Sequence, residues 1–196
     1  AKVGRAFSNK AIEMALAHYP GFHMTSPPTE ESPYAVYWPA LVPSELIEQV
    51  VHVDGREVTI SPVLPPASAA AAAVPAVRLL PAPSGLATRA PLGRLFGTRS
   101  GDKGGNANLG VWATSPGAYA WLAETLTAER LKQLLPECRG LAVERHLLPN
   151  ILALNFVIKG LLGDGVSSST RSDPQAKSLG EYLRARVVEL PAALLE

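Results

Sequence analysis

The sequence predicts an α+β fold in which an antiparallel sheet carries helices on one face. The first observation is the order of apolar patterns from residue 91 onward, where two strand-like runs are followed by helix, two strands, helix and strand. Without the first strand, this order is βαββαβ, the split βαβ arrangement. The second observation is size: 196 residues, 47% of them hydrophobic, can form one good domain and part of another.

Residues 1–61 are predicted to be the tail of a larger N-terminal domain. The pattern predicts a helix over 9–18, stopped by a Tyr-Pro-Gly turn, and a helical turn capped by Ser44. A hairpin follows, with strands on both sides of Asp54-Gly55, a type I′ turn signal. These elements are too few to bury a core of their own. Together with the absence of an initiator Met, they suggest that the chain is a piece of a longer protein.

Residues 62–90 are predicted to be a linker. The stretch is rich in proline and alanine and almost uncharged. Because proline cannot donate to a strand ladder and alanine buries little area, a tether between two folded parts is the natural interpretation.

Residues 91–196 are predicted to form the compact domain. The first helix begins at Ser115-Pro116, with a capping oxygen and a proline in its first turn, and the second begins at Asp173-Pro174. The strands are predicted over 92–98, 108–114, 141–148, 151–159 and 187–190. The last is an edge strand closed by proline, and the first adds to an edge or extends the sheet. We therefore expect a ferredoxin-like fold with an extra N-terminal strand.

The most informative segment is the glycine-rich run over 98–110, predicted to be a turn between two strands. It is not a Walker loop, which requires four residues between its first glycine and Gly-Lys. Its cations suit an anion, its carboxylate suits a cation or a proton, and its amides add a directional polar lining. The alternative is a hairpin whose glycines only satisfy turn geometry and whose charges are solvated. The candidate ligand-binding residues here are Arg99, Ser100, Asp102, Lys103, Asn106 and Asn108.

A second polar segment, residues 163–173, leads into the predicted second helix. Long connections are often binding loops, and a helix N-terminus favours anions. Ser169, Arg171 and Lys177 are therefore candidate ligand-binding residues. The alternative is a flexible surface loop, and for Asp173 we expect a helix-capping role.

Asn155 interrupts one of the most apolar runs of the chain, residues 151–158. A buried amide needs partners, so Asn155 either has a structural hydrogen-bonding role, which we favour, or lines a ligand site.

Composition and motifs exclude several function classes. The net charge of +1 gives no support for nucleic acid or an anionic membrane surface, and no apolar run approaches the roughly 20 residues of a membrane helix. The single Cys138 excludes an internal disulfide and favours the cytoplasm. The histidines have no metal-ligand spacing, and no Gly-x-Ser-x-Gly motif is present. We therefore assign no metal site and no catalytic residue.

Several separated blocks of the compact domain resemble the C-terminal, ferredoxin-like domain of the acyclic terpene utilisation AtuA-like family. These blocks are 99–105, 108–111, 154–157, 169–171 and 173–177. Residues 1–61 look like the tail of that family's larger N-terminal domain, most of which would be absent. The resemblance implies bacterial breakdown of acyclic isoprenoids through acyl-CoA thioesters, and it supplies a pathway rather than a mechanism.

Two function hypotheses follow. In the first, the chain handles a branched or isoprenoid acyl-CoA, or another anionic small molecule, and Arg99, Lys103 and Arg171 contact its phosphate or carboxylate. A CoA thioester would then be a ligand, and no resident cofactor is assigned. In the second, the domain serves assembly: it forms a homo-oligomer or docks an acyl-CoA carboxylase or dehydrogenase, as the apolar strand 151–158 and the long tether suggest.

Overall fold

The computed structural model describes residues 4–24, 26–61 and 80–195, and the chain divides into two compact units, Ala1–Ala35 and Val36–Glu196. Most of the predicted linker, residues 62–79, lies outside the described residues. Within those that are described, none of the helices has the length and apolar character needed to span a bilayer.

The described residues of the first unit include the helix α1 (Arg5–Ala15). It begins four residues earlier than predicted and ends three residues earlier, where the amide of Leu16 donates to the carbonyl of Glu13. Ser8 is the one residue of this helix that is buried. A helix so exposed is stabilised by few tertiary contacts among the described residues.

The second unit begins with two small elements that were predicted. Strands β1 (Gln49–Val53) and β2 (Arg56–Ile60) pair around Asp54 and Gly55, whose φ angles of 49° and 71° are those of a type I′ turn. The helical turn Ser44–Leu46 is also present. The prediction that Ser44 caps it is wrong, because Pro43 holds the cap position and no side chain bonds to the turn.

The main sheet has four antiparallel strands in the order β4-β5-β7-β6. They are β4 (Phe96–Lys103), β5 (Asn106–Ala113), β6 (Val143–Leu148) and β7 (Ala153–Ile158). The order β5-β7-β6 is that expected for the first three strands of a ferredoxin-like fold. The α+β class is therefore confirmed.

The last strand does not join this sheet as a ferredoxin-like order requires. Strand β8 (Val187–Pro191) pairs with β3 (Ala87–Pro91) in a separate two-stranded sheet, and β4 takes the edge position beside β5. The reason is local: β4 and β5 are joined by a two-residue turn and pair over eight residues each, so β4 occupies the edge first. The residues of β3 before Pro91 also show that the end of the predicted linker, 87–90, is a strand.

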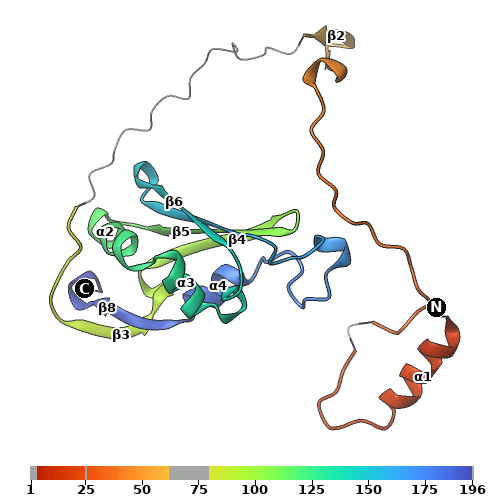
Figure 1. Ribbon diagram of the computed structural model, residues 1–196, viewed down its shortest axis with the longest axis horizontal. Coiled ribbons are helices and arrows are strands. Elements are labelled where there is room, and N and C mark those ends of the chain that lie inside the picture. The colour runs from red at the N-terminus through yellow and green to blue at the C-terminus, as the bar shows by residue number, and fades with distance from the viewer. Residues whose placement is uncertain (1–3, 25, 62–79, 196) are drawn as a thin grey trace. The chain divides into compact units, whose positions relative to one another are not determined.

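Three helices cover one face of the main sheet: α2 (Pro116–Thr125), α3 (Ala128–Leu134) and α4 (Leu179–Arg184) (Figure 1). Ser115 caps α2 as predicted, its Oγ accepting from the amide of Ala118 at 3.2 Å. The apolar positions beyond α2 form the separate helix α3. The prediction that the last helix begins at Asp173 is wrong, since α4 begins six residues later.

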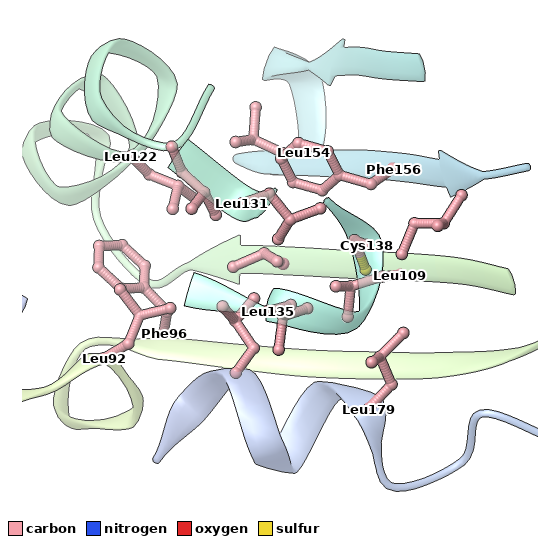
Figure 2. Close-up of a cluster of buried hydrophobic side chains, with 14 of the residues drawn as sticks. Leu92, Phe96, Leu109, Leu122, Leu131, Leu135, Cys138, Leu154, Phe156 and Leu179 are labelled. Carbon is pink, nitrogen blue, oxygen red and sulfur yellow. The ribbon is translucent and has the colours of Figure 1, made fainter. Parts of the chain in front are cut away.

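The core lies between the sheet and these helices. Alternate residues of β5 and β7 point into it, and Leu109, Leu154 and Phe156 are fully buried. From the other side come Leu131 and Leu179, and Figure 2 shows these side chains gathered between strands and helices. Burying each such side chain contributes roughly 1.5–3 kcal/mol. The opposite face of the sheet, which we call the open face, is covered by none of the helices α2, α3 and α4.

Candidate functional site

The glycine-rich run was predicted to be a loop, and this is wrong. Almost all of it is strand: β4 continues to Lys103, β5 begins at Asn106, and only Gly104 and Gly105 form the turn. Gly104 has a φ of 64°, a conformation that glycine adopts at little cost. Because side chains alternate along strands, the polar residues of this run divide between the two faces of the sheet.

The strand register decides which residues share the open face. Buried Leu109 and Val111 point toward the helices, so Asn106 and Asn108 of β5 lie on the open face. Arg99 is paired with Gly110, and Lys103 with Asn106, which places both cations there as well. Asn155 of β7 is on the same face, since it is also paired with Gly110. Ser100 and Asp102 alternate to the helix side of β4.

A groove of about 570 Å³ extends over the open face to the edge strand β4, where Ser100 and Asp102 of the helix side also line it. Lys177, which lies in the chain ahead of α4, lines this groove together with Arg99 and Lys103 of β4. The groove therefore brings together candidate residues that are far apart in the sequence. The remaining lining residues are Ser100, Gly101, Asp102, Asn108, Gly110, Val111, Trp112, Leu148, Ile151, Ala153, Leu154 and Asn155. One groove therefore combines three cationic residues and one carboxylate residue, Asp102, with an apolar end.

The middle of the groove contains a pair of amides that bind each other. Asn108 Nδ2 donates to Asn155 Oδ1 at 2.8 Å, and Asn155 Nδ2 donates to Asn108 Oδ1 at 3.1 Å. Asn155 is half-buried, and this pairing gives it the structural hydrogen-bond partner that was expected. Each amide keeps one N–H and one lone pair of its oxygen for a ligand, so the two roles predicted for Asn155 are compatible.

Two further candidates have hydrogen bonds within the fold. Ser100 Oγ accepts from the amide of Gly180 at 2.9 Å and donates to the carbonyl of Lys177 at 3.2 Å. Ser100 thereby holds the segment that brings Lys177 to β4. Asn106 Oδ1 accepts from the amide of Gly160 at 2.9 Å and connects the start of β5 with the end of β7.

The rest of the second polar segment lies outside the groove. Arg171 forms a salt bridge with Glu137, with Nη2 and Oε2 2.6 Å apart, in a different depression of the surface. Ser169 Oγ accepts from the amide of Arg171 at 3.3 Å. The prediction that Asp173 caps a helix is wrong, because Ser178 holds the N-cap position of α4 and no side chain caps that helix. Asp173 instead accepts from the amides of Lys177 and Ser178 in the turn ahead of α4. The two basic segments therefore meet through Lys177 and not through Arg171.

Sequence reasoning missed the apolar part of the groove and its floor. Trp112 is 41% exposed on the open face, and its indole lies directly over Gly97, its register partner. Gly101 and Gly110 have no side chain above them, and a methyl group added at either would meet no side-chain atom within 4 Å. The signal was available, because Gly97, Arg99, Gly101 and Lys103 alternate at the spacing of one strand face.

The chemistry of the buried thiol argues against a cysteine nucleophile. Cys138 is fully buried, and burial raises the pKa of its thiol to about 11, with the Glu137 carboxylate acting in the same direction. A neutral thiol is a poor nucleophile. In the described part of the chain, no group of three or more His, Cys, Asp or Glu residues is placed to hold a metal ion.

Comparison with known families agrees with this fold. Residues 90–189 match the family model of the AtuA ferredoxin-like domain, so the sheet, its helices and the groove lie in a domain of this class. Residues 1–53 match the model of the acyclic terpene utilisation family protein AtuA. The chain belongs to the AtuA family. No curated protein and no solved structure matches it.

Proposed function

We propose that this domain of an AtuA-type protein binds an anionic ligand, an acyl carboxylate or an acyl-CoA, in the groove on the open face. The supporting observation is that Lys177 comes from a distant segment to line the same groove as Arg99 and Lys103. Among the described residues, the ion pairs include none of these three cations. Charge-assisted hydrogen bonds from such groups are what a carboxylate or phosphate requires.

The ligand's role in the cell follows from the family. An AtuA-type protein acts in the use of acyclic terpenes, and we propose that the ligand is an intermediate of isoprenoid or branched acyl-CoA catabolism in the cytoplasm. Arg171 was expected to contact the same anion. Its salt bridge with Glu137 outside the groove leaves that role to Lys177 in this proposal.

The proposal is tested by calorimetric titration of the whole chain with inorganic phosphate, free CoA and isovaleryl-CoA. Removing one of three cations that contact an anion should weaken binding about tenfold, as in Lys177→Gln or Lys103→Gln. The matched control is Lys10→Gln, on the exposed surface of α1 in the other unit. Equal affinity for the wild-type chain and both groove variants would refute the proposal.

A second candidate function is assembly, either as a homo-oligomer or by docking an acyl-CoA carboxylase or dehydrogenase. It is favoured by the exposed apolar residues Trp112, Leu148 and Ile151, which gather at one end of the open face. Analytical ultracentrifugation at micromolar concentration distinguishes the two. A chain that stays monomeric and binds neither the carboxylase nor the dehydrogenase would refute the assembly function and favour ligand binding on this face.

A further inference from the structure

The groove has a second half whose chemistry differs from that of the cations. Trp112 on β5 is paired with Ala153 of β7, and Ala153 is paired with Leu148 of β6, so three apolar residues form one row across the open face. Ile151, 61% exposed, adds to this end from the connection between β6 and β7. Because removing apolar surface from water is favourable, exposed apolar side chains at the end of a groove favour the binding of an apolar group.

The floor between the two halves has no side chain above it. Gly110 lies between Arg99 on one neighbouring strand and Asn155 on the other, and Gly101 is the register partner of Asn108. A methyl group added at Gly101 would meet nothing within 4 Å, and one at Gly110 only the carbonyl oxygen of Arg99 at 3.6 Å. Neither position has a φ that requires glycine. The space above these residues is therefore open to a ligand that lies against the backbone.

The length of this track follows from the register. Trp112 is opposite Gly97, which is two residues from Arg99 and six from Lys103 along β4. With a rise of about 3.3 Å per residue, the apolar row is roughly 7 Å from the level of Arg99 and roughly 20 Å from that of Lys103. A compact anion would touch only the cations, whereas an extended molecule can reach both ends.

We propose that the groove binds its ligand lengthwise, with the anionic group at Arg99, Lys103 and Lys177 and an alkyl chain lying over Gly110 toward Trp112. This inference rests on the proposed anion site and extends it to a ligand class, anionic amphiphiles with an extended chain. Trp112 and Gly110 are then the residues that determine specificity: the indole contacts the chain, and the glycine leaves room for it.

The test is calorimetric titration of the whole chain with acetate, hexanoate and decanoate below its micelle concentration. Because the groove is open, each methylene is about half-buried and tightens binding about twofold. Decanoate has four more methylenes than hexanoate and should therefore bind roughly fifteenfold more tightly. In Trp112→Ala and Gly110→Val this dependence on chain length should be lost, while weak acetate binding remains.

Matched controls separate the groove from general effects. Trp38→Ala removes an indole that is 87% exposed and does not line the groove, and Gly140→Ala adds a methyl group at a glycine with open space around it. Both should retain the dependence on chain length, and thermal melts should show that all four variants fold.

The outcomes distinguish the two proposals. If all three carboxylates bind equally and Lys177→Gln weakens each, the anion site stands and the lengthwise inference is overturned. If both groove variants fold and still prefer decanoate, the inference is also overturned, because the chain lies elsewhere. If none of the carboxylates, phosphate or CoA binds, both proposals fail.

Discussion

The contact between Gly97 and Trp112 gives a sharp prediction about the open face. A Cβ atom at Gly97 would lie 2.2 Å from Trp112 Cε2, so in Gly97→Ala the indole must retreat by more than an ångström. Overpacking of this kind costs about 1–3 kcal/mol. We expect a value in the lower half of that range, because Trp112 is 41% exposed and can turn toward solvent.

The matched control is on the same strand and the same face. Gly101→Ala adds the same methyl group to β4, four residues away, where nothing lies within 4 Å. Replacing glycine by alanine in a strand gains about 0.5–1 kcal/mol through the unfolded chain, and this gain is common to both variants. The difference between the two free energies of unfolding, measured by urea denaturation, therefore isolates the clash with Trp112.

A third variant identifies the source of the cost. In a Trp112→Ala background the indole is gone, so Gly97→Ala should affect stability as Gly101→Ala does. Equal free energies of unfolding for Gly97→Ala and Gly101→Ala, with Trp112 present, would refute the reasoning. So would a Gly97 penalty that persists without the tryptophan.

Three more predictions concern groups whose environments are defined. The raised pKa of Cys138, about 11 against 9.0 for the ordinary thiol, means that the folded chain holds this proton more tightly. The protonated thiol therefore contributes about 2–3 kcal/mol to the free energy of unfolding below pH 9, and this contribution is lost as the pH rises through 11. Urea denaturation at increasing pH should show a steeper alkaline loss of stability in the wild type than in Cys138→Ala. Ser115→Ala removes the cap of α2 and should lower the free energy of unfolding by about 1 kcal/mol; no change would show that the bond to Ala118 contributes nothing. Asn155→Ala leaves the amide of Asn108 without its partner and should cost about 1–3 kcal/mol. The double alanine variant should cost clearly less than the sum of the single ones, and simple additivity would contradict the pairing.

The sequence predicted what depends on local pattern. The hairpin at Asp54-Gly55 and the cap at Ser115 follow from residue types whose conformational preferences are strong. The apolar runs over 108–114 and 151–159 likewise predicted strands, and β5 and β7 occupy these positions. These features need no knowledge of distant contacts.

Long-range pairing could not be predicted in the same way. A ferredoxin-like order gives the edge beside β5 to the last strand. The two-residue connection that gives this edge to β4 is hidden when the glycine-rich run is interpreted as a long turn. Glycine and charge are typical of turns and predict a loop for the glycine-rich run, whereas its alternation on one strand face indicates the strand that the structure shows. Lys177 reaches the site only because Ser100 holds its carbonyl from 77 residues away.

The pairing of β3 with β8 has a mechanical consequence. Ala87 is opposite Pro191, so the chain enters and leaves the ferredoxin-like domain at neighbouring points. Tension between the flanking segments would load this small sheet one residue pair at a time, from Ala87 toward Pro91, rather than along all its bonds at once. Under such a pull the β3–β8 pair would unzip first, and the four-stranded sheet that carries the groove would bear the load only afterwards.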